Sequence, residues 1–318
     1  MTVPLIETRN LKKYFNTPRG LLHAVDNINI KIMRGETLGL VGESGCGKST
    51  LGRVLLRLIS ATDGEVLYNG ENILEYKKQR MNEMRKKMQI IFQDPYSSLN
   101  PRMSVASLIE EPLKVCGICA NAKERNERVD YLMRTVGLAQ RFKNSYPHEL
   151  DGGRRQRIGV ARALSVEPEL IVCDEPVSAL DVSIQAQILN LLMDLQEDKG
   201  LTYIFITHDL SVVKHISTHI MVMYLGQGIE YAEKNELFAN YKHPYTEALL
   251  SAIPLPSIRP EDRLRNIIAG EVTSPINPKP GCRFAPRCPY AKPECQAEDI
   301  PYVEVSPNHF VACLRYRK

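Results

Sequence analysis

One short segment restricts the fold of this chain more than any other. Gly42 to Thr50 reads GESGCGKST, which fits the pattern GxxxxGK[ST], and it lies between the strand-like run TLGLV and a helix-like run. A strand, a glycine-rich loop and a helix in this order predict a phosphate-binding loop, because backbone N–H groups and the helix N-terminus surround phosphate oxygens. The alternative is a chance glycine turn, which would not require the flanking strand and helix.

The side chains of this loop fit a nucleoside triphosphate. We expect Lys48 to reach the β and γ phosphates and Ser49 to ligate Mg²⁺. The other loop residues that we expect to contact ATP are Gly42, Ser44, Gly45, Cys46, Gly47 and Thr50.

A second segment supplies carboxylates for hydrolysis. LIVCDE at 170 to 175 is an apolar strand that ends in Asp174, a candidate Mg²⁺ ligand, and Glu175, a candidate general base for the attacking water. The alternative is a buried strand that ends in two solvated carboxylates. Together the two segments predict a P-loop NTPase.

The pattern of apolar residues predicts an α/β fold with an insertion. Short β-branched runs alternate with helical stretches, whereas residues of about 95–160 hold charged amphipathic segments typical of a helical subdomain. Proline-rich, aperiodic sequence follows Ser251. We therefore expect an ATPase domain over 1–255, and a proline-rich linker with a small cysteine-rich extension over 256–318.

Composition limits the partners and the compartment. The net charge is only +4, from 41 basic and 37 acidic residues, so nothing global requires a nucleic-acid partner. The N-terminus has no apolar signal-peptide core, and runs such as Ile220 to Leu225 are too short to span a bilayer. We expect a cytosolic chain with peripheral membrane contact, whose eight cysteines are thiols or ligands rather than disulfides.

Further motifs make the first 255 residues or so resemble ABC ATPases. The resemblance implies that Gln93 in IFQDP is the Q-loop glutamine, close to Mg²⁺ and water, and that Asp181 in SALD belongs to the D-loop. It implies that His208 in FITHD contacts the γ-phosphate, although a lone histidine would more often be an ordinary surface residue. Phe15, with Tyr14 as the alternative, would stack on adenine, unless one of them is plain core packing.

LDGGRRQRIGVARAL resembles the ABC signature, but it departs from the family at its first functional position. In this family two nucleotide domains face each other head to tail, and a signature serine donates to the γ-phosphate of the opposite site. Asp151 stands there instead, ahead of Gly152 and Gly153, and Arg154 replaces the usual glutamine. Two like charges about 4 Å apart repel by several kcal/mol at a surface-like dielectric constant. The change indicates either a weakened composite site in a heterodimer or a tolerated substitution, with Arg154 and Arg155 as neutralising groups.

Longer phrases narrow the resemblance to ATPase subunits of oligopeptide and dipeptide importers, a group that includes nickel importers. These phrases are QDPYSSLNPRMSV, CDEPVSALDVSIQAQILNLL, KHPYTEALLSAIP and GCRFAPRCPYAKPEC. The resemblance implies a five-part system at the cytoplasmic face of the cell membrane: an extracytoplasmic peptide-binding protein, two membrane permease subunits and two different ATPases. Because other subunits read the cargo, dipeptide, oligopeptide and nickel stay open.

Four cysteines gather near the C-terminus. Cys282, Cys288, Cys295 and Cys313 are separated by five, six and seventeen residues, without the tight pairs that structural zinc sites usually use. Four thiolates from one loop-rich segment favour a [4Fe–4S] cluster, with zinc or unligated cysteines as alternatives and His309 as a substitute ligand. Cys116 and Cys119 are interpreted as small core residues.

Two rival functions belong to other classes. A soluble ABC protein of translation or DNA maintenance typically has two nucleotide domains or a long coiled-coil insertion, neither of which this sequence contains. A small-molecule kinase would not need the signature, the D-loop and the histidine together.

Overall fold

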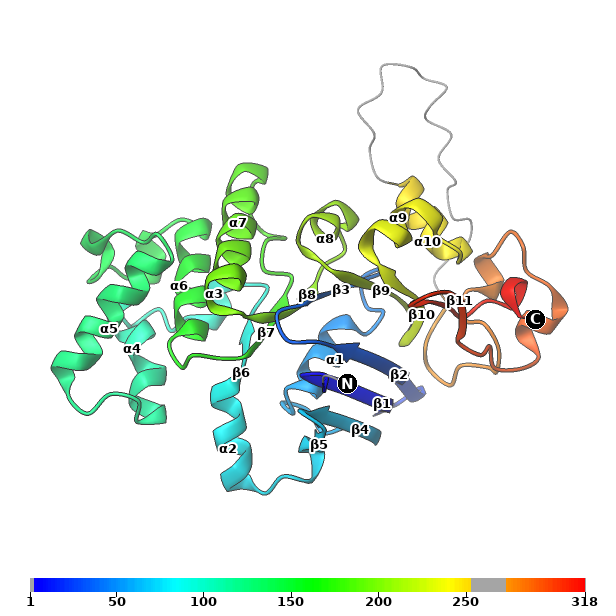
Figure 1. Cartoon of the computed structure of the whole chain (residues 1–318), viewed down its shortest axis with the longest axis horizontal. Coiled ribbons are helices and arrows are strands. Elements are labelled where there is room, and N and C mark those ends of the chain that lie inside the picture. The colour runs from blue at the N-terminus through cyan, green and yellow to red at the C-terminus, as the bar shows by residue number, and fades with distance from the viewer. Residues whose placement is uncertain (1–2, 253–272, 318) are drawn as a thin grey trace, which may run out of the picture. The chain divides into compact units, whose positions relative to one another are not determined.

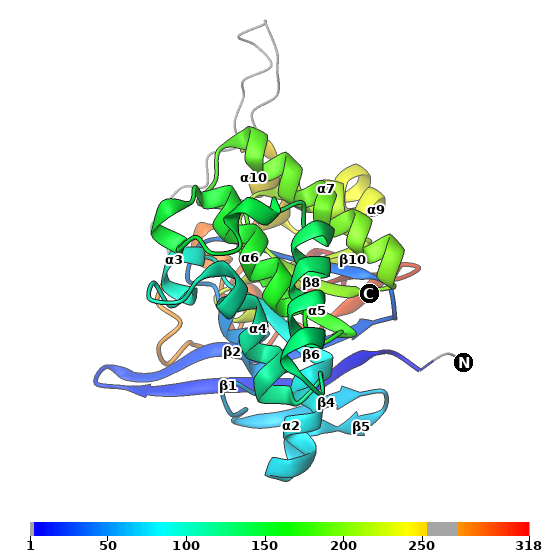
Figure 2. The same cartoon turned by 90° about the vertical axis from the view of Figure 1, so that its left-hand side faces the viewer.

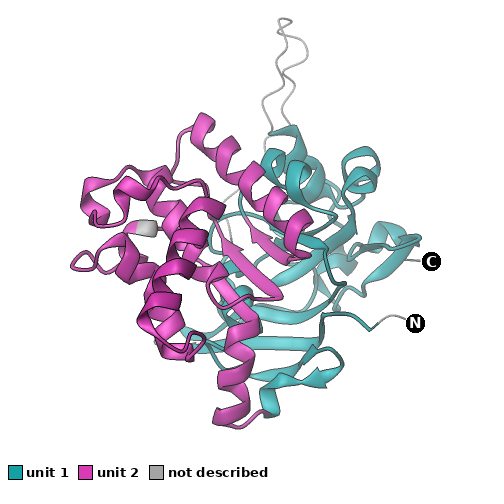
Figure 3. Ribbon diagram, turned by 60° about the vertical axis from the view of Figure 1, so that its left-hand side comes forward, with its two compact units in different colours: residues 1–75, 207–318 teal, residues 76–206 magenta. Residues whose placement is uncertain are grey.

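The computed structural model describes residues 3–252 and 273–317, which form two compact units (Figure 3). Unit 1 comprises Met1–Glu75 and Thr207–Lys318, and unit 2 comprises Tyr76–Ile206. Strands and helices alternate in both units, as the predicted α/β class requires. The predicted domain boundary at residues 255 and 256 and most of the proline-rich linker lie outside the described residues.

Unit 1 contains an antiparallel sheet near the N-terminus. Its strands are β1 (Ile6–Thr17), β2 (Gly20–Ile32), β4 (Asp63–Tyr68) and β5 (Glu71–Asn72), in the order β2-β1-β4-β5 (Figure 1). In the long β1–β2 hairpin Tyr14 pairs with His23 and Phe15 with Leu22. Because successive side chains of a strand point to opposite faces, Tyr14 and Phe15 are directed to different sides of this sheet.

A second set of strands in unit 1 carries the phosphate loop. The order is β11 (Val303–Ser306), β12 (His309–Val311), β10 (Gln227–Glu233), β9 (His219–Tyr224) and β3 (Thr37–Val41). β3 is buried along its whole length and runs parallel to β9. The helices of this unit are α1 (Lys48–Leu55), α8 (Leu210–Ile216), α9 (Lys234–Asn240) and α10 (Pro244–Ser251).

The cysteine-rich extension shares the core of unit 1. β12 pairs with β10, with Val311 opposite Glu230, so the extension continues the sheet. Phe284 is buried in the same apolar cluster as Tyr224 and Tyr245, whose ring centroids lie 5.3 Å from that of Phe284. Burying an aromatic ring is one of the larger apolar contributions to a core, so this packing fastens the extension to the phosphate-loop unit.

Unit 2 combines three parallel strands with a helical part. β6 (Met88–Ile91), β7 (Leu170–Asp174) and β8 (Thr202–Ile206) pair in the order β8-β7-β6. The helices are α2 (Lys78–Lys87), α3 (Pro95–Ser98), α4 (Val105–Cys116), α5 (Ala122–Thr135), α6 (Gly152–Leu164) and α7 (Val182–Lys199). Figure 2 shows α4, α5 and α6 next to one another. The segment from α3 to α6 spans Pro95 to Leu164, and the sequence predicts the helical subdomain over about 95–160.

Side-chain caps explain where the main helices of unit 2 begin. Ser104, Asn121, Asp151 and Asp181 occupy the N-cap positions of α4, α5, α6 and α7, and each accepts a hydrogen bond from a backbone N–H of the first turn. Two of these caps, Asp151 and Asp181, are also predicted nucleotide contacts. Helix formation therefore fixes both carboxylates at helix N-termini.

Candidate functional site

The phosphate loop of unit 1 lies between β3 and α1, as the sequence predicts. α1 begins at Lys48, and Gly47 takes the N-cap position with φ 107°. A Cβ on Gly47 would lie 2.0 Å from the carbonyl oxygen of Ala24 and in a backbone conformation that side chains rarely adopt, so only glycine fits. Ser44 and Gly45 are exposed, whereas Ser49 and Thr50 are partly buried at the start of α1.

Lys48 lies across the loop that it is predicted to serve. Its ammonium donates to the carbonyl oxygens of Gly42 at 2.7 Å and Glu43 at 3.0 Å, and the residue is only 5% exposed. Phosphate oxygens would replace these carbonyls as stronger, charged acceptors. The Lys48 ammonium therefore lies against the predicted phosphate-binding loop.

Sequence reasoning missed two residues that hold this loop from outside. The hydroxyl of Tyr245 accepts from the backbone N–H of Glu43 at 2.9 Å. Arg287 donates to both carboxylate oxygens of Glu43, at distances of 3.0 to 3.2 Å. Both residues lie in phrases singled out from the sequence, Tyr245 in KHPYTEALL and Arg287 in GCRFAPRC. Those phrases were used only to identify the family and not to assign residues to the site.

His208 also belongs to unit 1 and is exposed. It follows Thr207, whose backbone N–H donates to the carbonyl oxygen of Leu40 in β3 at 3.1 Å. Asp209 then caps α8 through the N–H of Ser211. The histidine is therefore anchored beside the strand that leads into the phosphate loop.

The two candidate aromatic residues, Tyr14 and Phe15, have different surroundings. The ring of Tyr14 stacks on His23 with centroids 3.9 Å apart, and its hydroxyl donates to Asp26 at 2.5 Å. Phe15 is partly buried, and the Lys13 ammonium lies 4.8 Å from its ring centroid. Because Tyr14 is already engaged on both its ring and its hydroxyl, Phe15 is the better candidate for stacking on adenine.

In unit 2 the two carboxylates lie at the end of β7, as the sequence predicts: Asp174 is its last residue and Glu175 follows it. Asp174 is 3% exposed at the end of the strand, and the backbone N–H of Glu175 donates to the carbonyl oxygen of Ile206 at 3.0 Å. Glu175 has φ 48°, which residues other than glycine rarely adopt. Gln93 Nε2 donates to Glu175 Oε2 at 2.9 Å, which brings together the predicted Q-loop glutamine and the predicted base.

The signature and D-loop residues meet in unit 2. Asp151 Oδ1 accepts from the Arg154 N–H at 2.8 Å, and Oδ2 accepts from the Arg154 guanidinium at 2.6 Å. A Cβ on Gly152 would lie 2.9 Å from Leu180, and one on Gly153 2.6 Å from Ile184, so the glycines permit close packing against the D-loop segment.

The carboxylates of Asp151 and Asp181 are surrounded by different groups. The sequence offered Arg154 and Arg155 as groups that could neutralise Asp151. Arg154 forms an ion pair with Asp151, whereas Arg155 donates to the carbonyl oxygen of Pro147 at 2.6 Å. Hydrogen bonds from the Ser183 hydroxyl and the Ile184 N–H lower the pKa of Asp181, so this carboxylate is charged at the N-terminus of α7.

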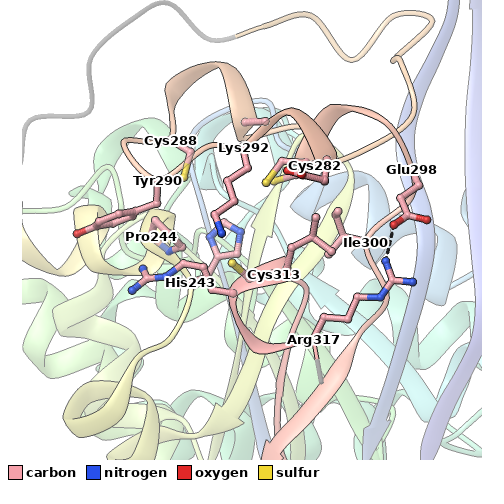
Figure 4. A pocket seen from close by; sticks show the side chains of 15 residues that line it. His243, Pro244, Cys282, Cys288, Tyr290, Lys292, Glu298, Ile300, Cys313 and Arg317 are labelled. Carbon is pink, nitrogen blue, oxygen red and sulfur yellow. Dashed lines mark hydrogen bonds and ion pairs between the residues drawn. The ribbon is translucent and has the colours of Figure 1, made fainter.

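The predicted cysteine ligands line one cavity of about 380 Å³ in unit 1. Figure 4 shows the sulfurs of Cys282, Cys288 and Cys313 directed toward this common space, and Cys295 also lines it. Burial raises the pKa of Cys282 to about 11 and raises the pKa of Cys288 and Cys313 as well. Within residues 3–252 and 273–317, no three His, Cys, Asp or Glu side chains are arranged to hold one metal ion.

Two interpretations of individual residues are wrong. His309 is not a substitute metal ligand, because its Nε2 lies 2.8 Å from Glu230 and its Nδ1 lies 3.2 Å from Glu236. Cys116 and Cys119 are not core residues, because both are partly exposed at and beyond the end of α4. In both cases the sequence shows the residue type but not its neighbours.

Within the described part of the chain, no helix has the length and apolarity needed to cross a bilayer. The model of the ABC transporter family matches residues 25–178, and that of the oligopeptide/dipeptide transporter C-terminal region matches residues 229–295. The first match covers the phosphate loop and Glu175. The second covers Arg287 and three of the pocket cysteines, which are Cys282, Cys288 and Cys295.

Curated proteins align with almost the whole chain. The putative oligopeptide transport ATP-binding protein YkfD of Bacillus subtilis is 52% identical, with 99% of this chain and 96% of that protein covered. The oligopeptide transport ATP-binding protein OppF of Escherichia coli is 50% identical, with 97% and 92% covered. A solved dimeric ATP-binding cassette in a post-hydrolysis state with ADP and Pi is 29% identical, with a TM-score of 0.67 over 72% of this chain and 98% of that chain.

Proposed function

This chain belongs to the ATP-binding subunits of ABC-type oligopeptide and dipeptide transporters, and from that premise we propose that it is one of two different ATPases in a five-part importer. Its hydrolysis of ATP powers peptide import. The proposed partners are two membrane permease subunits, a second ATPase and, indirectly, an extracytoplasmic peptide-binding protein. The proposed location is the cytoplasmic face of the cell membrane, and no nucleic-acid partner is proposed.

The phosphate-binding part of the reaction rests on unit 1. Phe15 would stack on adenine, the loop N–H groups would surround the phosphates, and Lys48 would exchange its carbonyl acceptors for β- and γ-phosphate oxygens. His208 would contact the γ-phosphate. The position of the His208 side chain would then depend on whether the γ-phosphate is present. Lys48, buried at the first residue of α1, supports this assignment.

The groups proposed to activate the attacking water lie in unit 2. The observation that supports this proposal is the hydrogen bond between Gln93 and Glu175. Glu175 would accept a proton from the attacking water while Gln93 orients the carboxylate. Mg²⁺, held by Ser49, Gln93 and Asp174, would supply positive charge that offsets the charge on the phosphate oxygens. Hydroxyl, amide and carboxylate oxygens are ligands that Mg²⁺ prefers, and the Gln93 amide nitrogen is engaged by Glu175, which leaves its oxygen for the metal.

Asp151 supports the proposal of two different ATPases. A carboxylate accepts hydrogen bonds but cannot donate one to a γ-phosphate, whereas Gly152 and Gly153 keep backbone donors in the same turn. The Arg154 partner offsets the charge without supplying the missing hydroxyl. We propose that a composite site containing this signature is weaker than one built from a serine-containing partner, which would make the two sites of the heterodimer unequal.

The cysteine pocket is proposed to hold a [4Fe–4S] cluster, with zinc as the alternative. The observation that supports it is the convergence of four thiols on one cavity. Buried thiols with raised pKa values stay protonated without a cation, so a positively charged metal centre would stabilise their thiolates. A cubane spreads its ligands over four irons and accepts wide spacings, whereas structural zinc sites usually use tighter pairs of ligands, which these four cysteines lack.

Reconstitution tests the proposed function. The chain, expressed with its two permease subunits and the second ATPase, should assemble with them and support ATP-dependent uptake of a labelled peptide into proteoliposomes. Lys48→Ala in this chain should reduce uptake because its phosphate contacts are lost. An ATP turnover that requires a phosphoryl acceptor would identify a kinase instead, and failure to bind any membrane subunit would favour a soluble ABC protein.

A further inference from the structure

A short turn of the extension reaches from the cysteine pocket to the phosphate loop, all within unit 1. Cys282 and Cys288 bound the turn, and the 3₁₀ segment Ala285–Arg287 lies inside it. Its two arginines, Arg283 and Arg287, are 7% and 8% exposed in their side chains. Buried arginines need acidic or carbonyl partners, and both find them beside the nucleotide site.

Arg287 holds the second residue of the phosphate loop. Its fork of N–H groups binds both oxygens of Glu43, and one nitrogen also lies 3.3 Å from the Tyr224 hydroxyl. Glu43 is fixed at its backbone as well, by the Tyr245 hydroxyl. Two-point binding to a planar guanidinium restricts both the position and the rotation of the carboxylate, which a single charge does not do.

Arg283 is linked to the same loop indirectly, through Leu225 and Gly226. Its guanidinium donates to the carbonyl oxygen of Leu225 and to the carboxylate of Asp26. The next residue, Gly226, donates its N–H to the carbonyl oxygen of Cys46 at 2.7 Å. The turn between the two cysteines is therefore connected to the phosphate loop at both Glu43 and Cys46.

We propose that Arg287 is a positioning residue for ATP, and that through it the cysteine-bounded turn sets the affinity of the phosphate loop for MgATP. The proposal rests on the ATP site described above, but not on which metal the cysteines hold. A loop that is already shaped before ATP arrives loses less conformational freedom on binding. If Cys282 and Cys288 lose their ligand in the pocket, the two ends of the turn become free to move. Arg287 then no longer holds the Glu43 carboxylate in one position.

Substitutions on both sides of the pair test the proposal by MgATP affinity, measured with the full chain by calorimetry. Arg287→Gln should weaken MgATP binding about tenfold. This is about the effect of losing one hydrogen bond to a charged group, here the bond from Arg287 to Glu43 that keeps the loop in shape. Arg287→Lys should retain part of the affinity because it keeps the charge without the fork. Glu43→Gln, which removes the more exposed partner, should match Arg287→Gln, and the double variant should be no weaker than either single variant.

The matched control is Arg128→Gln, because Arg128 forms an arginine–carboxylate pair with Glu167 in unit 2 and belongs neither to the phosphate loop nor to the lining of the cysteine pocket. It should bind MgATP like the parent. In the assembled transporter, Arg287→Gln should raise KM for ATP far more than it lowers kcat. If Arg287→Gln is too unstable to purify, Glu43→Gln decides alone. A parent that binds MgATP while Glu43→Gln and Arg287→Gln bind it equally well overturns the proposal, whereas a parent that binds no ATP overturns the proposed function.

The link to the cysteines has its own test. Cys288→Ser should weaken MgATP binding to about the level of Arg287→Gln, and the combined variant should show no further loss, because both changes release one constraint. Additive losses would show that Cys288 acts independently of Arg287, and an unchanged affinity in Cys288→Ser would show that the turn keeps its position without the Cys288 thiol. Either result overturns the link.

Discussion

Gln93 Nε2 lies 2.9 Å from Glu175 Oε2, across 82 positions of sequence. The pair joins the loop after β6 to the residue after β7, two strands that run parallel and adjacent in unit 2. A glutamine at this point can orient a carboxylate without neutralising it, because an amide carries no charge. The hydrogen bond therefore fits the proposed division of roles, in which Glu175 is the base and Gln93 positions it.

Glu175→Gln should leave MgATP binding intact and lower hydrolysis at this site by at least about a hundredfold, the scale of a lost general base. Single-turnover hydrolysis in the assembled transporter measures it, and Lys48→Ala is the contrast, because its defect should lie in nucleotide binding. Parent-like turnover by Glu175→Gln would show that another group accepts the proton.

Phe15→Ala should weaken binding of ATP about tenfold or more, because stacking of an aromatic side chain on a base contributes roughly 1 to 3 kcal/mol. Tyr14→Phe is the matched control, since it removes only the hydroxyl that binds Asp26. Calorimetry with MgATP compares the two. If Tyr14→Ala reduces the affinity and Phe15→Ala does not, the assignment is reversed.

Asp151→Ser should strengthen ATP-dependent dimerisation of the isolated chain about tenfold, because an acceptor becomes a donor toward the γ-phosphate. The start of α6 should persist, since serine caps a helix as well as aspartate does. Light scattering at saturating MgATP, with Glu175→Gln as the background to prevent hydrolysis, gives the dimer fraction. An unchanged fraction would mean that Arg154 already compensates for the carboxylate.

Protein purified without oxygen should be brown and contain about four irons per chain, as a thiolate-held cubane requires. Cys288→Ser should remove the colour, whereas Cys116→Ser, at the end of α4 in unit 2, should keep it. Iron and zinc analysis with visible absorption measures both. Colourless protein with one zinc per chain would replace the cluster by the alternative metal.

We expect the stability of the packed extension to depend on pH through His309. Burial opposes its charge, but hydrogen bonds to Glu230 and Glu236 raise the pKa of His309 above its ordinary 6.5. The contribution of these contacts to the stability of the folded chain is therefore fully present below pH 6.5. It is lost as pH rises through the higher pKa that His309 has in the folded state.

The free energy of unfolding should thus differ most between the parent and His309→Gln in mildly acidic buffer, and least in alkaline buffer. Burial lowers the pKa of His243 to about 4, which favours the opposite trend, and His243 is present in both proteins. Denaturant unfolding at several pH values measures this. A difference that grows toward alkaline pH would contradict the assigned charge.

The local pattern of the sequence was sufficient for the nucleotide-binding elements. The run TLGLV, the glycines around Cys46 and the LIVCDE strand predict a phosphate loop and two carboxylates because each depends on neighbours a few residues away. The α/β class follows from the same local patterns, and the transporter family was inferred from the resemblance of longer phrases to known importers. Both agree with the comparisons. Helix caps such as Asp181 are equally local, since a cap bonds within its own first turn.

Only the tertiary structure decided which distant groups meet. Arg287 and Glu43 are 244 positions apart, and their contact exists because β12 and Phe284 attach the extension to the core that carries the phosphate loop. The same packing placed His309 between carboxylates instead of beside a metal. Periodicity and spacing report on bonds within one element, whereas a buried ion pair depends on how the whole unit packs, and no local pattern encodes that arrangement.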